Sequence, residues 1–246
     1  MRWLSRWLRP PDHPRMAVTV VSHRDSIVAD SATEQWSPVF SLLDSRGIPA
    51  TWATGARDTA RLASLLVGSR VSHELAHLDF GRAVAANLPS FRHQSQLAQK
   101  VSLPLRTLVT LSRGVHPSVL AQLQALAVVP LHRRGAISHT GQLRALAWNI
   151  WEAPATDRTT TSPSDETLAR LKIRVRQVVR QSSRLHLVID PEFPLAGGEL
   201  QQFERWLDQV SDYAQRGWIR FETVAQAASD ISSSLQQQRS LDRQAA

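Results

Sequence analysis

Four residues in three segments of the sequence have side chains that could bind a metal or move a proton. Asp25 follows one apolar run and stands beside Arg24, His73 and His77 are four residues apart, and Asp190 ends another apolar run. An aspartate and two histidines can hold a catalytic divalent metal and leave positions open for water and substrate. On a helical turn, the i, i+4 spacing would direct both imidazoles to one point. The pattern is compatible with a metal site, although nine histidines in 246 residues also produce such a pair by chance.

Other chemistries are excluded by what the sequence lacks. There is no cysteine, so disulfides, thiolate metal sites and cysteine nucleophiles are impossible. The sequence contains no dinucleotide-binding glycine motif, no P-loop, no nucleophile elbow and no HExxH metalloprotease motif. The Gly197-Gly198 pair before a predicted helix is only a weak signal for an anion.

The chain is basic, and nearly all of its basic residues are arginines. Lys and Arg number 29 against 21 Asp and Glu, giving a net charge of +8. This charge suits an anionic partner, but a compositional preference for arginine explains it equally. The arginines are spread along the chain, so we do not expect nucleic acid as a partner. Four of them are predicted on the solvent face of one helix: Arg174, Arg176, Arg180 and Arg184.

The candidate residues must be positioned by alternating strands and helices. Apolar, β-branched runs predict strands at residues 17–22, 48–51, 70–72, 105–111, 127–131, 143–150, 185–189 and 218–221. Amphipathic spacing predicts helices at residues 33–45, 59–66, 117–126, 166–180, 198–216 and 223–235. Residues 156–165 are expected to form a loop, and residues 236–246 a loose polar end.

This alternation predicts right-handed βαβ units and a mainly parallel sheet, either open or closed into a barrel. Functional loops then lie at the carboxyl ends of the strands. The loops expected there are residues 22–30, 54–57, 72–81, 112–116 and 190–198. We expect a single domain at residues 17–235 between a basic, Trp- and Arg-rich arm at residues 1–16 and a polar segment at residues 236–246.

Several segments occur in an informative order, and the most specific of them is LLDSRGIPATWATGA at residues 42–56. It resembles the second-strand segment of the polysaccharide deacetylases, the NodB-like carbohydrate esterases. The segments SHELAH, SRGVHPSVLAQLQALAVVPL, LHLVIDPEFP and GWIRFETVAQAA follow in the order expected for the family. The resemblance covers residues 17–230 and implies a distorted (β/α) barrel of the deacetylase type, with mainly parallel strands.

The resemblance also implies a function. In that family a metal, zinc or a similar divalent ion, polarises the acyl carbonyl and binds the attacking water. One aspartate acts as the base, a second aspartate and two histidines hold the metal, and a late histidine protonates the leaving amine. The substrate would be a carbohydrate bearing N- or O-acyl groups.

Several positions depart from the family pattern. Asp25 matches the metal-binding aspartate, but Arg24 occupies the position of the base and cannot accept a proton. Arg113 keeps its place in the third motif, while Asp190 stands where the acid histidine is expected. We therefore expect Asp190 and Arg113 to be the catalytic or cleft-lining residues of a hydrolase with altered motifs, either active or catalytically silent.

The second motif has two alignments. If His73 and Glu74 match the family's His-Glu pair, His77 is the first metal ligand and Gly81 replaces the second. If spacing is kept instead, His73 and His77 are the ligand pair. The metal, if any, would thus be held by Asp25, His77 and, in the second alignment, His73.

Binding without catalysis is the alternative function. Arg24 and Arg113 would then recognise an anionic group of a carbohydrate or another partner. Trp148 and Trp151 could form a sugar-stacking platform or belong to the core. Residues 1–16 could contact an anionic membrane or fold back onto the domain. We expect a cytoplasmic protein, since no apolar run reaches the roughly 18 residues of a membrane span and no secretory signal is apparent.

Overall fold

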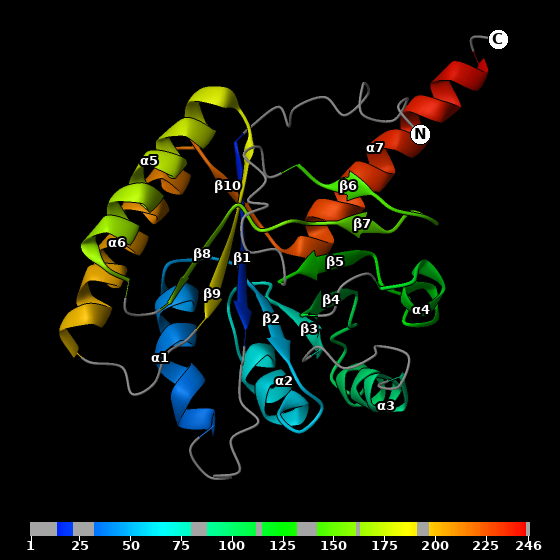
Figure 1. Ribbon diagram of the computed structural model, residues 1–246, viewed down its shortest axis with the longest axis horizontal. Coiled ribbons are helices and arrows are strands. Elements are labelled where there is room, and N and C mark those ends of the chain that lie inside the picture. The colour runs from blue at the N-terminus through cyan, green and yellow to red at the C-terminus, as the bar shows by residue number, and fades with distance from the viewer. Residues whose placement is uncertain are drawn as a thin grey trace.

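The computed structural model describes residues 14–21, 32–79, 88–111, 115–131, 142–160, 163–190 and 197–244. These residues form strands and helices that alternate along most of the chain (Figure 1). The strands are β1 (Arg15–Val21), β2 (Thr51–Thr54), β3 (Glu74–Asp79), β4 (Thr107–Thr110), β5 (Ala127–Pro130), β6 (Arg144–Ala145), β7 (Trp151–Glu152), β8 (Asp157–Thr160), β9 (Arg184–Asp190) and β10 (Arg220–Glu222). The helices are α1 (Ala32–Ser45), α2 (Thr59–Val67), α3 (Leu88–Gln99), α4 (Pro117–Gln122), α5 (Asp165–Gln181), α6 (Gly197–Gln215) and α7 (Val224–Gln244).

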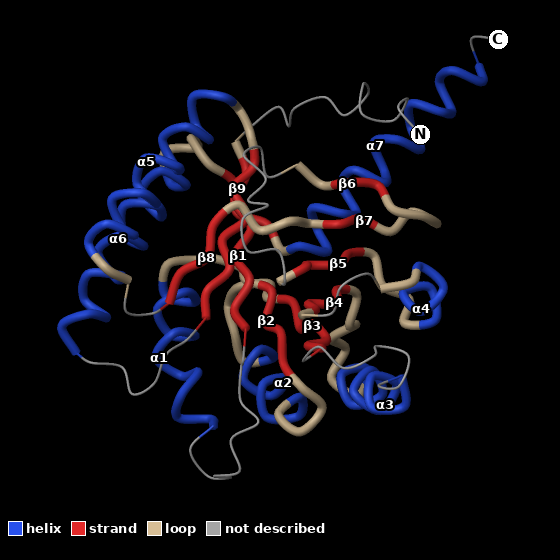
Figure 2. The backbone as a smooth tube through the Cα atoms, in the orientation of Figure 1, coloured by secondary structure: helices blue, strands red, loops and turns tan. Residues whose placement is uncertain are grey.

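All strands belong to one curled sheet (Figure 2). Its order is β6-β7-β5-β4-β3-β2-β1-β9-β8, and β10 pairs with the start of β1. Every pairing is parallel except the β6–β7 hairpin. Because parallel strands need helical crossovers, α1 to α6 cover the outside of the curl. The predicted distorted (β/α) barrel is confirmed.

The core has an outer and an inner part because successive residues of a strand face opposite sides. On β1, Met16, Val18 and Val20 pack outwards in the cluster that includes residues of α1, α2, α5 and α6. Ala17 and Val21 face inwards, where the first half of α7 fills the curl. A third cluster joins α3 and α4 to β4 and β5.

Helix α5 shows how local sequence sets an element's ends. The Ser164 hydroxyl accepts from the Thr167 amide at 3.2 Å, and Asp165 and Glu166 complement the helix dipole. The helix ends at Ser182, which has a left-handed φ of 46°.

The Ser182 conformation gives a first testable prediction. A serine in the left-handed region is strained, whereas glycine is not. Ser182→Gly is therefore expected to raise the free energy of unfolding by up to about 1 kcal/mol. Urea denaturation should show this, with Ser183→Gly as the neighbouring control. A lower stability for Ser182→Gly than for Ser183→Gly would contradict the prediction.

Several predicted elements are wrong in detail. Residues 70–72 are not a strand; β3 begins at Glu74 and occupies most of the expected 72–81 loop. Residues 143–150 contribute to a hairpin, not one strand, and the expected 156–165 loop contains β8. Helix α3 was not predicted, and α7 continues to Gln244 through most of the segment expected to be loose. In the part of the chain that the structure describes, no helix combines the length and apolarity needed to cross a membrane.

Candidate functional site

The carboxyl ends of the parallel strands are the place where the fold would position a site. Arg24, Asp25 and Arg113, three of the expected site residues, lie outside the described residues. The others can be located, and they do not gather at this edge. His73 precedes β3, His77 lies within it, and Asp190 ends β9.

His73 and His77 do not share a helical turn, so the i, i+4 spacing does not bring their imidazoles together. Both belong to an extended segment, and a strand rises about 3.3 Å per residue, so their Cα atoms are about 13 Å apart. His73 lies at the amino end of β3, opposite the edge where a deacetylase-like site would be. The spacing that suggested one ligand pair instead directs the two imidazoles into separate surroundings.

His73 is packed in the outer core. Its Nδ1 accepts hydrogen bonds from the Ala50 amide at 3.0 Å and from the Trp52 indole at 3.3 Å. Its Nε2 lies 3.8 Å from an Asp44 carboxylate oxygen, too far for a hydrogen bond. Burial lowers the pKa of this imidazole, while Asp44 partly opposes that shift. His73 is a buried neutral side chain between α1 and the sheet.

His77 joins β3 to α3. Its Nδ1 lies 2.6 Å from Gln94 Oε1, and its Nε2 lies 3.3 Å from the Ser95 hydroxyl. Gln94 in turn donates to the Thr54 carbonyl at 2.8 Å. Burial lowers the pKa of His77 to about 4. In this arrangement both ring nitrogens of the first expected metal ligand have partners on α3.

Asp190 does reach the carboxyl edge. Its carboxylate lies 2.5 Å from Arg158 Nη2, and the two residues are partly exposed. The pair joins the ends of β8 and β9, which are neighbours in the sheet. A carboxylate oxygen that accepts from a guanidinium cannot donate a proton to a leaving group. Asp190 therefore fits the role of holding the Arg158 side chain in place. It does not fit the role of the proton-donating histidine.

The two tryptophans expected to bind sugar have different positions. Trp151 is 3% exposed, packs in the inner core and donates its indole N–H to Ser232 at 2.8 Å, so of the two alternatives for this residue the structure has the core position. Trp148 is 64% exposed at the tip of the β6–β7 hairpin, with a φ of 54°. That tip precedes β7 and so lies at the amino edge, away from Asp190.

Two polar groups face inwards: His186, for which the sequence indicated no role, and Glu74, which was considered only as part of the possible His-Glu pair. His186 lies 2.8 Å from the Thr19 hydroxyl and 3.2 Å from the Ala153 carbonyl. Glu74 accepts from Thr51 and from the backbone of α7. Side chains along a strand alternate between its two faces, so His186 and Asp190 of β9 lie on the same face. That alternation is the sequence signal that could have located His186.

A divalent metal requires several of these side chains to converge. Within the described ranges, no group of three or more His, Asp or Glu residues is placed to hold an ion. His73 and His77 together do not fit a metal site, because they lie apart and both ring nitrogens of His77 have partners on α3. We therefore derive no metal-dependent reaction step from the His, Asp and Glu side chains that the structure describes.

Comparison with known proteins agrees with the fold. No family model matches the sequence, and no curated protein matches it. Among solved structures, one described as a polysaccharide deacetylase from Mycobacterium smegmatis superposes with a TM-score of 0.65, at 14% identity over 91% of this chain and 92% of that chain. Puue allantoinase superposes with a TM-score of 0.61, at 11% identity over 89% of this chain and 92% of that chain. The chain therefore has the fold that the segment GIPATW and its successors predicted, that of the polysaccharide deacetylase structure.

Proposed function

We propose that this protein is a carbohydrate-binding module on the polysaccharide deacetylase fold and that it does not hydrolyse acyl groups through a metal. The observation that carries the proposal is the position of the two histidines. His77 has both ring nitrogens bonded to α3, and His73 lies at the opposite end of β3. A ligand pair that is separated in this way cannot hold one ion at the carboxyl edge.

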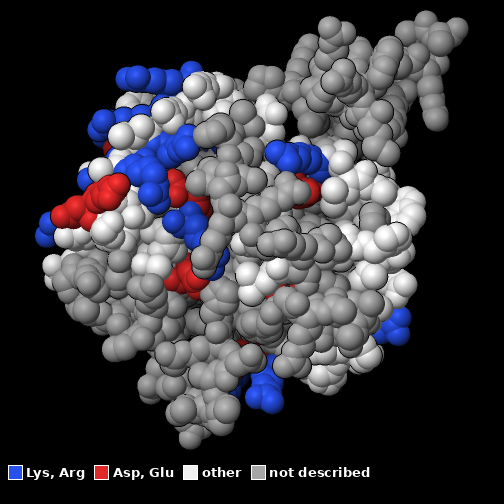
Figure 3. Space-filling model, viewed as in Figure 1, with Lys and Arg blue, Asp and Glu red and all other residues white. Residues whose placement is uncertain are grey.

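The chemistry of the carboxyl edge supports an anionic ligand. Arg158 is exposed there and is held by Asp190. In the sequence, Arg24 and Arg113 also belong to motifs that follow β1 and β4. Arginine forms paired hydrogen bonds with carboxylates and sulfates, so a uronic or sulfated sugar is the ligand class that this edge fits. Figure 3 shows Lys and Arg side chains together with Asp and Glu over the side where α5 lies, so that surface is mixed in charge.

Metal-dependent deacylation, with Asp25 as a ligand, is the competing function, and one set of measurements separates the two. The purified full-length chain should be incubated with Zn²⁺, separated from free ion by gel filtration and analysed for bound metal. We expect no stoichiometric zinc, no acetate released from N-acetylglucosamine oligomers, and oligouronate binding that EDTA does not change. Zinc at one equivalent that is lost in His77→Ala, together with acetate release, would overturn the proposal.

The binding site itself is tested by Arg158→Ala. A charge-assisted hydrogen bond contributes about 1.5–3 kcal/mol, so oligouronate affinity should fall by about tenfold or more. Arg144→Ala is the matched control, because Arg144 is an exposed arginine on β6, at the other end of the sheet order. Equal affinities for the two variants would exclude Arg158 from the binding site.

A further inference from the structure

Three arginines stand in a row on the inner face of the sheet, at its amino edge. Arg15 on β1 is in register with Arg184 on β9 and with Arg220 on β10. Residues in register on parallel strands project from the same face, and neighbouring strands are about 4.8 Å apart. This finding corrects the expectation that Arg184 lies on the solvent face of a helix, since Arg184 is buried on β9.

The described carboxylates next to this row neutralise only two of the three charges. Glu222 binds Arg15 at 2.8 Å and Arg184 at 2.6 Å. Asp230 on α7 binds Arg15 at 2.5 Å. Among the described residues, no carboxylate lies within ion-pair distance of the exposed Arg220. The row therefore has one positive charge in excess, at its β10 end.

Helix α7 presents a neutral side chain on the same side as that charge. Gln226 and Asp230 are four residues apart and so share one face of α7. Gln226 belongs to a capping box: its Oε1 accepts from the Thr223 amide at 2.8 Å, and the Thr223 hydroxyl accepts from the Gln226 amide at 3.2 Å. The box uses the side-chain oxygen, and the Gln226 NH₂ group has no acceptor in the part of the chain that the structure describes.

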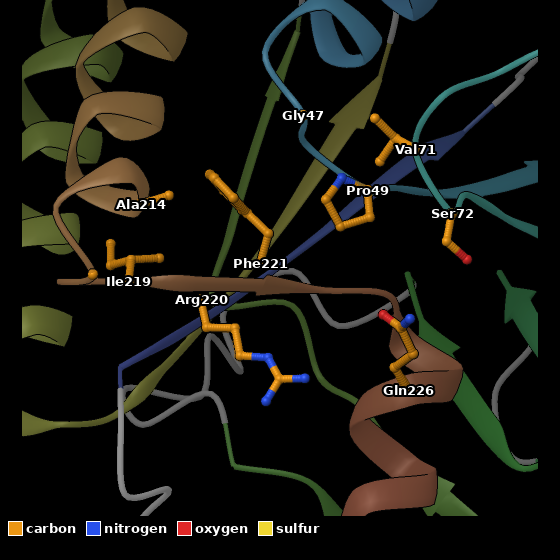
Figure 4. Close-up of a pocket in the computed structure, with 10 residues that line it drawn as sticks. Gly47, Pro49, Val71, Ser72, Ala214, Ile219, Arg220, Phe221 and Gln226 are labelled. Atoms are coloured by element: carbon orange, nitrogen blue, oxygen red, sulfur yellow. The ribbon is translucent and has the colours of Figure 1, made fainter.

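Arg220 and Gln226 both line a pocket of about 570 Å³ (Figure 4). The figure shows Arg220 on the same side of β10 as α7, with Phe221 on the opposite side. Among the described strands β10 pairs only with β1, so its other edge is open beside the segments that lead into β2 and β3. Those segments contribute Pro49 and Val71 to the pocket. The pocket thus combines polar donors with an apolar wall at one open strand edge.

Two of the residues that line this pocket, Gly47 and Gly217, are glycines, so no side chain projects over its opening there. Gly47 and Gly217 have φ values of 66° and 72°, which other residues adopt only with strain. A Cβ atom at either position would meet nothing within 4 Å, so the space above them is open. A small ligand can therefore reach β10 from solvent.

We propose that this amino-edge pocket binds a small organic anion: a carboxylate or phosphate group on an apolar body. The anionic oxygens accept from the Arg220 guanidinium and the Gln226 NH₂ group, which together supply the missing counter-charge. The apolar body covers Phe221, Pro49 and Val71 at the open edge of β10. This site lies at the other end of the strands from Asp190 and does not depend on the carbohydrate site proposed above.

Titration calorimetry of the full-length chain with phenyl phosphate and with benzoate tests the proposal. Both should bind, and inorganic phosphate and benzyl alcohol should each bind at least about tenfold more weakly, because each lacks one half of the recognised chemistry. Binding of the two anions no tighter than that of benzyl alcohol would overturn the proposal. A preference between phenyl phosphate and benzoate identifies which anionic group the site takes.

Gln226→Glu is the decisive variant. Glutamate also completes a capping box, so α7 is retained, but its second oxygen gives Arg220 an internal carboxylate. We expect anion affinity to fall by at least about tenfold. Arg216→Ala is the matched control for charge, because Arg216 pairs with Asp212 and lies over Trp218 close to the pocket. It should leave the affinity within about twofold of the wild type.

A gain in affinity provides an independent check. Asp230→Asn removes one of the two carboxylates from the row while Glu222 still holds Arg15, so phenyl phosphate should bind more tightly. Arg158→Ala, at the carboxyl edge, should have no effect on this ligand. Unchanged binding in both Gln226→Glu and Asp230→Asn would show that the arginine row does not recognise the anion.

Discussion

Replacing Glu74 with alanine is expected to lower the free energy of unfolding by about 3 kcal/mol or more, because buried donors that lose their acceptor each cost about 1–3 kcal/mol. Glu74 is buried on the inner face of β3. Its carboxylate accepts from the Thr51 hydroxyl at 2.8 Å, from the Ala225 amide at 3.0 Å and from the Thr107 hydroxyl. One side chain thus connects β2, β3 and β4 to the first turn of α7.

The position of Glu74 explains why the effect should be large. Burial raises the pKa of this carboxyl, and the hydrogen bonds from Thr107, Ala225 and Thr51 partly offset that shift. The amide of Ala225 is one of the N–H groups that a helix start leaves without an internal acceptor. Alanine at position 74 would leave the Ala225 amide without an acceptor inside the curl. The first turn of α7 would then lose its hydrogen bond to β3.

The conservative variant separates hydrogen bonding from charge. Glu74→Gln keeps an acceptor for Ala225, and its NH₂ group can donate to a threonine hydroxyl. We expect it to stay within about 1 kcal/mol of the wild type in urea denaturation. If alanine and glutamine destabilise the protein equally, the carboxylate charge matters more than the bonds. If alanine costs less than about 1 kcal/mol, Glu74 does not anchor α7.

Much of the fold could be predicted because each long element has a strong local signal. Helix α5 has its apolar stripe, its serine N-cap and its acidic first turn all in agreement. β1 and β9 are apolar runs buried on both faces. The short elements have no such signal. The β6–β7 hairpin turns at Trp148 and Asn149 in left-handed conformations. Asn149 suits such a turn, but the tryptophan before it does not indicate one.

The site was harder to predict, because the spacing of two residues in the sequence fixes their distance in space only once it is known whether they lie on a helix or on a strand. His73 and His77 share a helical face if the segment is a helix, but on a strand they are about 13 Å apart. The segment ELAHLD has buried Glu, His and Asp side chains, so it does not read as a buried strand. Partners on neighbouring strands and on α3 and α7 satisfy those groups, and no short window of sequence contains both members of such a pair.

The arginine row shows the same limit. Arg15, Arg184 and Arg220 are separated by 169 and 36 positions, and only strand register brings them together. Scattered arginines therefore gave no prediction of a local patch, although the excess of positive charge was evident from composition. The partners Glu222 and Asp230 lie near Arg220 in the sequence but bind Arg15.

The second large effect is expected on acidification, through His186. Burial lowers the pKa of His186 to about 4, against an ordinary value of 6.5, with a small further contribution from Arg184. The hydrogen bonds to Thr19 and the Ala153 carbonyl fit a neutral ring that donates at Nδ1 and accepts at Nε2. Because the unfolded state binds a proton first as the pH falls below 6.5, unfolding becomes easier between pH 6.5 and pH 4. At pH 5 this one group should cost about 2 kcal/mol relative to pH 8.

His186→Gln isolates that contribution, because glutamine keeps a donor and an acceptor but does not titrate. Urea denaturation from pH 8 to pH 5 should show the variant losing about 2 kcal/mol less than the wild type. The difference between proteins is needed because Glu74, whose pKa is raised, acts in the opposite direction at lower pH in both. His93→Gln, on the exposed surface of α3, controls for loss of a histidine. Parallel pH profiles for the wild type and His186→Gln would mean that the pKa of His186 is not lowered in the folded protein. The inner face of the curl would then have to accommodate a charge beside Thr19 once the pH falls below 6.5.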